Sequence, residues 1–219
     1  MEISTSILNI KEENITETFY NIEAAKTDYF HIDVMDGKFV SNNTVDKMQQ
    51  YIDILSGITN TPIEVHLMVK DVKKYIDIFI PNNPTKIIFH AKALKSSEEV
   101  FKMIEYIKDN NIQVGLALNP EDSIDSIKEF ISKIHQVLVM TVNPGQGGQT
   151  LIPECIKKAQ ELKEYLDSQN LETQIEVDGG VNLQNIKEIA SSGVDIAVAG
   201  TAIVNAVDMN YVIYTMHQA

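Results

Sequence analysis

Two polar side chains on one face of a predicted strand carry the first sign of chemistry in this sequence. Residues 29–40 read as a strand that ends in a loop, and side chains along a strand alternate between its faces. His31, Asp33 and Met35 therefore share one face, while the other face is apolar and suits packing against a helix. Burying Asp33 without a partner would cost several kcal/mol, so a cation shared with His31 is the simplest compensation. On this stretch alone, a salt-bridged Asp beside a core His is an equally good interpretation.

The elements that must position these residues alternate between strand and helix along the whole chain. Further strands are predicted over residues 3–8, 62–69, 86–91, 113–118, 136–142, 174–178 and 195–199. Apolar residues at helical spacing predict helices over residues 11–25, 44–55, 72–80, 97–110, 123–133, 153–168, 183–191 and 202–217, with Thr44 as the N-cap of the second. Eight strand–helix units with short connections predict an all-parallel α/β sheet. Eight such units in this length favour a closed (β/α)8 TIM barrel over an open doubly wound sheet.

Length and composition agree with one α/β domain. The 219 residues, 44% of them hydrophobic, suit a single barrel domain over residues 1–219, and no linker-like segment interrupts the chain. A formal net charge of −13 argues against a nucleic-acid partner. The single cysteine, Cys155, permits neither an intramolecular disulfide nor a cysteine-based zinc site. The N-terminus lacks a signal-peptide pattern and no apolar run is of membrane-spanning length, so we expect a cytoplasmic protein with no membrane partner.

Polar residues gather where the predicted strands end, which is where barrels of this kind place their active sites. His31 and Asp33 end the second strand, His66 lies on the third, and Asp178 ends the seventh. This mixed set of nitrogen and oxygen donors suits one divalent ion, such as Zn, Fe, Mn or Co. Taken alone, His66 reads more simply as a core histidine. Four separately compensated polar groups at one end of a barrel are harder to arrange than one metal, so we predict a metal site.

Glycines follow the last three predicted strands and indicate a second site, for an anion. Glycine lets a backbone approach a ligand closely and present its N–H groups, and loops after the last strands of a barrel often hold phosphate. All 18 basic residues are Lys, so backbone donors replace the bidentate clamp that Arg would offer. Tight turns without a ligand are the alternative for any one loop. The predicted substrate-binding residues here are Gly145, Gly147, Gly148, Gly179, Gly180, Gly200 and Thr201.

Asp33 and Asp178 come from strands on different sides of the barrel mouth, which suits acid/base work on the two faces of one carbon. A divalent metal beside a carbonyl acidifies the neighbouring C–H by stabilising the enediolate. One carboxylate takes the proton and the other returns it on the far face, which epimerises a sugar next to its ketone. Met35, Met68 and Met140 fall at strand ends on the same side. They would exclude water from the intermediate, unless they are ordinary core residues.

Eight short motifs occur in order along essentially the whole chain. They are residues 6–8 (SIL), 31–37 (HIDVMDG), 65–68 (VHLM), 115–120 (GLALNP), 140–145 (MTVNPG), 147–149 (GGQ), 176–180 (EVDGG) and 199–201 (AGT). Together they resemble the ribulose-phosphate 3-epimerase family. The resemblance implies a barrel of the ribulose-phosphate-binding type that holds a Zn- or Fe-type ion at His31, Asp33, His66 and Asp178, with the two Asp residues as the acid/base pair. It also implies substrate contacts at Ser6, His66 and the three methionines, phosphate on backbone groups, and association into a homo-oligomer.

Four departures from the family pattern lie near the barrel mouth, at Thr5, Ser41, Lys92 and Gln146. None removes a predicted metal ligand or acid/base group, so they bear on which sugar phosphate is used. We predict an isomerase of carbohydrate metabolism that converts D-ribulose 5-phosphate to D-xylulose 5-phosphate, a step of the pentose phosphate pathway. A D-allulose 6-phosphate 3-epimerase, from a near relative of the family, is the alternative.

Two other classes compete with the epimerase. A non-catalytic sugar-phosphate-binding protein could use the same barrel, because fold does not determine function, but it predicts a broken set of metal ligands. A metal-dependent lyase or decarboxylase would need a catalytic Lys among the strand-end acids. Lys70 and Lys92 are the candidates near those ends, and neither falls within the carboxylate cluster.

Overall fold

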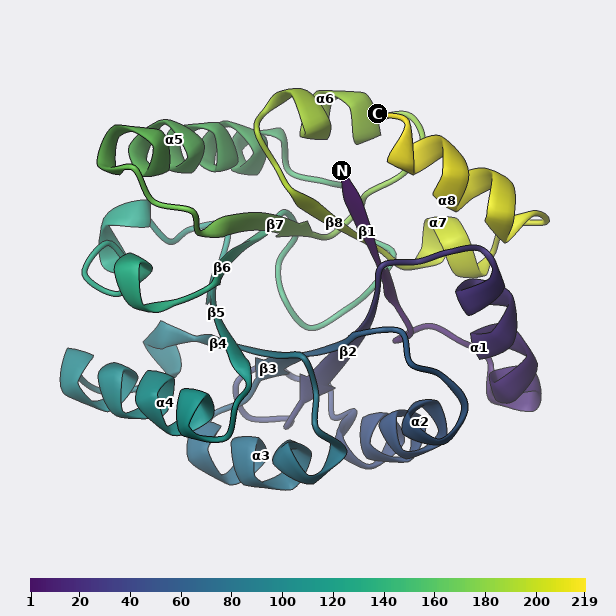
Figure 1. Ribbon diagram of the computed structural model, residues 1–219, viewed down its shortest axis with the longest axis horizontal. Helices are drawn as coiled ribbons and strands as arrows, with labels where there is room; N and C mark the ends of the chain where they lie inside the picture. The colour runs from purple at the N-terminus through teal and green to yellow at the C-terminus, as the bar shows by residue number, and fades with distance from the viewer.

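Eight parallel strands close into a barrel in the computed structural model, which describes residues 1–219 apart from the side chain of Glu12 (Figure 1). The strands are β1 (Glu2–Ser6), β2 (Tyr29–Met35), β3 (Ile63–Met68), β4 (Lys86–His90), β5 (Gln113–Leu118), β6 (Gln136–Met140), β7 (Gln174–Asp178) and β8 (Ile196–Ala199). They are hydrogen-bonded in sequence order, and β8 pairs with β1 to complete the closure. The predicted (β/α)8 barrel is confirmed, and its organisation as a single domain stays a prediction.

Helices surround the ring of strands (Figure 1). They are α1 (Ile15–Ala24), α2 (Val45–Ile58), α3 (Val72–Phe79), α4 (Ser97–Asp109), α5 (Pro153–Gln169), α6 (Ile186–Ser191), α7 (Thr201–Val204) and α8 (Met209–His217). Short 3-10 turns occupy Glu12–Asn14, Ile80–Asn82, Ala91–Ala93, Ile124–Ser126 and Ile131–Lys133. Among the described helices, none has both the length and the apolar character that crossing a membrane requires.

The two faces of a strand have separate roles, as the alternation in β2 predicts. Phe30, Ile32 and Val34 are fully buried in the layer between barrel and helices, and the ring of Phe30 meets Phe19 of α1 edge-on at 5.9 Å. Burial of each such side chain is worth roughly 1.5–3 kcal/mol. His31, on the opposite face, contacts Asp178 of β7 across the barrel interior. The apolar face thus holds the strand in place while the polar face supplies the site.

The helix predicted over residues 123–133 is wrong. Two separate 3-10 turns, Ile124–Ser126 and Ile131–Lys133, occupy this connection instead. The Ser123 hydroxyl accepts a hydrogen bond from the backbone N–H of Asp125 (3.2 Å), and the Ser126 hydroxyl donates to the carbonyl of Ser123 (2.7 Å). Such local bonds compete with a helical ladder, and the β-branched isoleucines of this segment add little helix propensity.

Two helix starts also differ from expectation. The helix predicted over residues 202–217 is divided into α7 and α8, because the Asp208 carboxylate accepts from the N–H of Tyr211 (3.0 Å) and starts a new helix. Thr44 occupies the N-cap position of α2, but its side chain does not cap the helix. Its hydroxyl donates to the carbonyl of Asp33 (2.6 Å) and accepts from the N–H of Met35 (2.9 Å). Thr44 therefore ties the start of α2 to the functional end of β2.

Candidate active site

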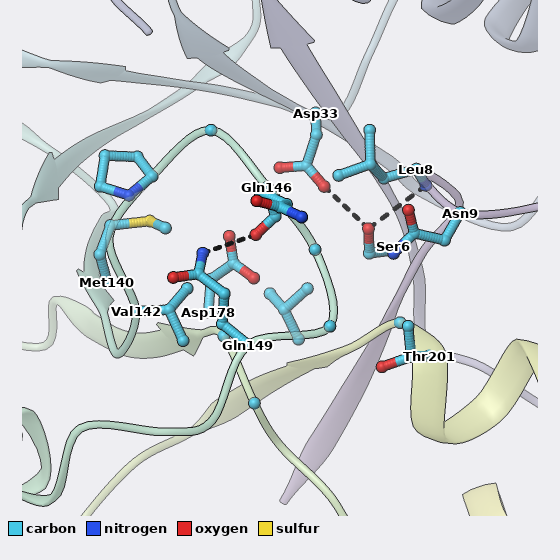
Figure 2. Close-up of a pocket in the computed structure, with 18 of the residues that line it drawn as sticks. Ser6, Leu8, Asn9, Asp33, Met140, Val142, Gln146, Gln149, Asp178 and Thr201 are labelled. Atoms are coloured by element: carbon cyan, nitrogen blue, oxygen red, sulfur yellow. Dashed lines mark hydrogen bonds between the residues drawn. The ribbon is translucent and has the colours of Figure 1, made fainter. Parts of the chain in front are cut away.

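A pocket opens at the carboxyl ends of the strands (Figure 2). Asp33 and Asp178 reach it from β2 and β7. The predicted substrate-binding residues that line it are Ser6, Met35, Met68, Met140, Gly145, Gly147, Gly148, Gly179, Gly180, Gly200 and Thr201. His66 is the exception, because its side chain is fully buried and lies outside this lining. Its contact with substrate stays a prediction.

Four polar residues on the pocket wall were not among the site residues predicted from the sequence: Asn9, Asn143, Gln146 and Gln149. Asn9 directly follows the SIL motif, and the two glutamines flank Gly147 and Gly148. Their places within the motifs or directly beside them were the available signal. A side chain next to a motif reaches a pocket or avoids it according to the loop's path, which spacing alone does not give.

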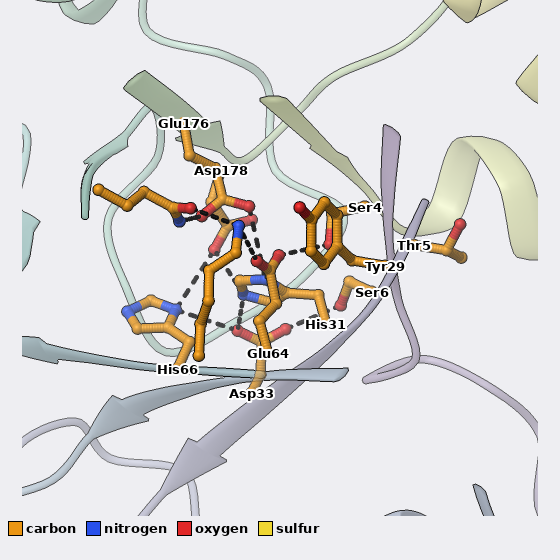
Figure 3. A network of polar contacts seen from close by, with 12 residues as sticks. Ser4, Thr5, Ser6, Tyr29, His31, Asp33, Glu64, His66, Glu176 and Asp178 are labelled. Carbon is orange, nitrogen blue, oxygen red and sulfur yellow. Dashed lines mark hydrogen bonds and ion pairs between the residues drawn. The ribbon is translucent and has the colours of Figure 1, made fainter. Parts of the chain in front are cut away.

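The four predicted metal ligands meet beside this pocket (Figure 3). Nε2 of His31 lies 3.4 Å from Oδ1 of Asp33 and 3.8 Å from Oδ2 of Asp178. Nδ1 of His66 lies 3.4 Å and 3.6 Å from the same two oxygens. All four atoms are within 4.8 Å of one another. This spacing accommodates one small ion, whose bonds to such atoms are about 2.0–2.2 Å long.

The two imidazole nitrogens that face this point have no hydrogen-bond partner among the described residues. They are Nε2 of His31 and Nδ1 of His66, and both are buried. The other nitrogen of each ring is occupied, because Nδ1 of His31 lies 2.9 Å from Glu64 Oε1 and Nε2 of His66 lies 2.9 Å from His90 Nε2. Leaving buried polar atoms unpaired is costly. Two available imidazole nitrogens and two carboxylate oxygens directed at one point fit a divalent ion.

Protonation of the same groups reveals the need for positive charge. Burial alone would raise the pKa of Asp33, but the neighbouring His31 outweighs it and holds this pKa below its usual range. Burial would lower the pKa of His31, yet Asp33 keeps it well above its usual range. The pKa of His66 is also raised, against its burial, by Asp178 and Asp33. The two carboxylates thus favour positive charge at this point, which a divalent cation would supply.

A second polar layer fills the barrel interior on the other side of His31 (Figure 3). It consists of Glu64, Lys86, Gln136 and Glu176, from four different strands, all with at most 1% of their surface exposed. Lys86 Nζ lies 3.2 Å from Glu64 Oε2 and donates to Gln136 Oε1 (2.6 Å), while Gln136 donates to Glu176. Lys86 therefore compensates a carboxylate that would otherwise be unstable in the interior. None of the four was predicted from the sequence as part of a buried layer, although Lys86 and Gln136 are polar residues that begin otherwise mostly apolar strands.

The glycine loops bring backbone close to the pocket at two points. Gly180 has a φ of +69°, and a Cβ there would clash with the backbone of Leu151, so only glycine fits this close approach. Gly200 lies against Ser6, where a Cβ would come within 3.3 Å of the Ser6 Cβ. Thr201 is the first residue of α7, so its N–H has no partner within that helix. Phosphate binding by these groups stays a prediction.

The loop that follows β6 extends over the barrel interior (Figure 1) and is held from two sides. Asn42, in the β2–α2 loop, donates through Nδ2 to the carbonyl of Gly145 (2.5 Å). The Gln149 amide donates to the carbonyls of Asn143 and Gln146, both at 2.7 Å. The loop is thereby fixed as one wall of the pocket.

The closed barrel, with an acid-lined pocket at the carboxyl ends of its strands, places the chain among the (β/α)8-barrel enzymes. A family model described as the ribulose-phosphate 3 epimerase family matches residues 2–204. The chain therefore belongs to the ribulose-phosphate 3-epimerase family.

Individual relatives agree with this assignment. The ribulose-phosphate 3-epimerase of Escherichia coli strain K12 is 38% identical over 214 residues, which cover 98% of this chain and 93% of the relative. That of Serratia marcescens is 38% identical over 201 residues, 92% and 94% of the two chains. The solved structure of 3-hexulose-6-phosphate synthase from Salmonella typhimurium has a TM-score of 0.70 at 15% identity, covering 100% of this chain and 97% of that one; it shares the fold. The chain is accordingly an isomerase of the epimerase type, and the non-catalytic alternative is set aside.

Proposed function

We propose that this chain catalyses the metal-dependent epimerisation of D-ribulose 5-phosphate at C3 to give D-xylulose 5-phosphate. The observation that carries the proposal is the approach of Asp33 and Asp178, from β2 and β7, to the same two histidine nitrogens, with both carboxylates on the pocket wall. The names of the relatives support a pentose phosphate as substrate. A cytoplasmic location and a role in the pentose phosphate pathway form part of the same proposal.

The two carboxylates act as the acid/base catalysts. A divalent ion held by His31, Asp33, His66 and Asp178 would supply positive charge beside the substrate carbonyl and so acidify the neighbouring C–H. One of the two Asp residues removes the C3 proton, and the other donates a proton to the opposite face of the same carbon. The Ser6 hydroxyl donates to Oδ2 of Asp33 (2.8 Å), which orients this carboxylate and leaves Oδ1 directed at the histidines.

Three methionines would protect the planar intermediate from water. Met35, Met68 and Met140 line the pocket, and each has at most 2% of its surface exposed. Met140 pairs in register with Asp178, and Met35 pairs with Met68 two residues beyond the Asp33–His66 pair. The thioethers therefore lie at the level of the acids or just beyond it, toward the carboxyl ends of the strands. Excluding water slows loss of the removed proton to solvent. Reprotonation of the carbon by the opposite carboxylate is then favoured over reprotonation by water.

Backbone groups would hold the phosphate end of the substrate. The N–H of Thr201 and the backbone at Gly180 and Gly200 line the same pocket as the acids. The chain contains no Arg, and its net charge of −13 offers no overall attraction to an anion. Close backbone contact, which glycine permits, is therefore the binding device that this chain offers.

A proton NMR time course in heavy water tests the proposal. Purified protein with added Zn²⁺ or Mn²⁺ is given D-ribulose 5-phosphate or, separately, D-allulose 6-phosphate. We expect loss of the C3 proton signal together with appearance of the 3-epimer, faster for the pentose phosphate. Faster turnover of the hexulose phosphate would transfer the proposal to the six-carbon sugar. If neither substrate exchanged or epimerised with metal confirmed in the protein, the proposed reaction would be wrong.

A further inference from the structure

We propose that His90 is a positioning residue, which accepts a hydrogen bond from the Nε2–H of His66 and thereby presents Nδ1 of His66 to the metal. This inference rests on the proposed function, in which His66 is a metal ligand. It gives a role to a buried histidine that neither contacts the pocket nor belongs to the four-residue ligand set.

The geometry places the two imidazoles end to end. His90 is the last residue of β4, and both His90 and His66 are fully buried. Their Nε2 atoms are 2.9 Å apart, their ring planes differ by 26°, and the ring centroids are 5.1 Å apart. The distance between the two Nε2 atoms is shorter than the distance between the ring centroids by about two ring radii. Both nitrogens therefore lie near the line that joins the two ring centroids. An imidazole N–H lies in the ring plane, and the contact is therefore a hydrogen bond along that line.

The position of the protons follows from ligation. A neutral imidazole carries one N–H, and the nitrogen that binds a metal must offer its lone pair. Nδ1 of His66 faces the two Asp oxygens of the metal site, so its proton must be on Nε2. The neighbour of that Nε2 is Nε2 of His90. His90 must then accept at Nε2 and carry its own proton on Nδ1.

The surroundings of His90 favour this acceptor state. His90 is fully buried, and burial favours the neutral form of an imidazole. The ring of Phe39 lies 4.9 Å from that of His90 and covers it from the β2–α2 loop. The acceptor is thus neutral and enclosed.

The two ligand histidines are therefore oriented by different chemistry. His31 donates from Nδ1 to the carboxylate of Glu64, whereas His66 donates from Nε2 to the neutral ring of His90. Hydrogen-bond partners of metal-binding histidines hold the tautomer and the ring angle, and their loss typically weakens metal binding by about 10–100-fold. Removing the acceptor at His90 would leave the His66 N–H buried and unpaired in the metal-bound state.

A pair of variants separates the acceptor from the volume of the side chain. His90→Leu removes the acceptor, and His90→Gln keeps a carbonyl oxygen that can accept from His66. Zn²⁺ affinity is measured by competition with a chromophoric chelator, with His135→Leu, an exposed histidine before β6, as the control. We expect about 10–100-fold weaker binding in His90→Leu and affinity close to that of the wild type in His90→Gln and His135→Leu. Wild-type affinity in His90→Leu, or an equal loss in both His90 variants, would overturn the proposal.

A second readout needs no substitution at His90 and so does not depend on a variant that folds. In Zn²⁺-loaded wild-type protein with ¹⁵N-labelled histidine, we expect the proton of His66 on Nε2 and that of His90 on Nδ1. A His90 proton on Nε2 would contradict the proposal. If the wild-type protein bound no metal at all, the proposed function would fail first, and this outcome is distinguishable from wild-type metal affinity in His90→Leu.

Discussion

Asp33 and Asp178 face the same two imidazoles but differ in their surroundings. The side chain of Asp33 is 5% exposed and accepts from Ser6, whereas that of Asp178 is 14% exposed at the pocket. Residue type and the alternation of side chains along a strand were enough to predict both acids, because each lies at the end of a strand on its inward face. The partners of the site residues were harder to predict. Ser6 contacts Asp33, Glu64 contacts His31 and His90 contacts His66, each from another strand and at a height that depends on the strand register.

Replacing either acid should abolish most turnover. We expect Asp33→Asn and Asp178→Asn each to lower kcat by at least about 10²–10⁴-fold, because each removes a group that transfers a proton on one face of C3. Turnover is measured from both epimers at saturating metal, and metal content is determined alongside because both residues are also predicted ligands. Asp109→Asn, at the end of α4, serves as the control. Turnover near the wild-type rate in both site variants would exclude the two-carboxylate mechanism.

The contacts of Asp36 predict how much this single residue contributes to stability. Its Oδ1 accepts from the backbone N–H groups of Lys38 (2.9 Å) and Phe39 (2.8 Å), and its Oδ2 accepts from that of Lys70 (2.8 Å). Asp36→Asn turns an amide NH₂ toward one of these donors, so we expect the free energy of unfolding to fall by about 1–3 kcal/mol at neutral pH. Urea unfolding measures the difference.

The pH dependence of that difference has a definite sign. Burial alone would raise the pKa of Asp36, but the backbone N–H groups of Lys70, Phe39 and Lys38 lower it below its ordinary value. A depressed pKa contributes stability that is fully present above the unfolded-state pKa of about 3.9. That stability is lost as the pH falls through the folded-state pKa. The gap between wild type and Asp36→Asn should therefore narrow in acid, and a gap that stayed constant down to the acid unfolding transition would refute this account.

At the scale of elements, the eight strands were predictable and some connections were not. Continuous apolar runs and inward polar residues at strand ends identify a strand whatever the details of its side-chain packing. Strands such as β5 (Gln113–Leu118) and β7 (Gln174–Asp178) therefore match their predicted bounds. The 3-10 turns of residues 123–133 escaped prediction because serine hydroxyls, which apolar spacing ignores, redirect the backbone hydrogen bonds there.

The contact between two loops gives a prediction for the pocket wall. Asn42→Ala removes the hydrogen bond to the Gly145 carbonyl, so we expect the loop after β6 to open more often. Backbone amides of residues 143–150 should then exchange with deuterium faster, and KM should rise more than kcat falls. Asn43→Ala is the matched control, because the Asn43 side chain accepts from the N–H of Val45 instead. Unchanged exchange in Asn42→Ala would show that the loop is held by other contacts.

For the whole molecule, the closed barrel could be predicted from the count of strand–helix units, but its polar interior could not. Lys86 and Gln136 each begin a strand that is otherwise mostly apolar, and sequence alone would place such residues at a solvated edge. Closure of the barrel turns them inward beside Glu64 and Glu176. Which strand ends meet across a barrel depends on its stagger, and no local pattern encodes that quantity.

Metal binding should stabilise the entire fold, because the predicted ligands join β2, β3 and β7 across the barrel. A ligand that binds the folded state adds about 2.7 kcal/mol at 100 times its Kd, so we expect the thermal midpoint to fall by several degrees when EDTA removes the metal. Adding Zn²⁺ back should restore it. Asp178→Asn, which lacks one ligand, should respond much less. Equal midpoints with and without bound metal in the wild type would contradict this linkage.

The buried layer of Glu64, Lys86, Gln136 and Glu176 also has a consequence for the order of events. It fills the interior on the far side of His31, while the pocket opens at the carboxyl ends of the strands. With metal and sugar bound as proposed, both enter and leave through the opening of the pocket, and the ion lies deeper than the sugar. Binding is then ordered: the ion binds before any substrate, and the product leaves before the ion can. Bound sugar phosphate therefore protects the ion from chelators.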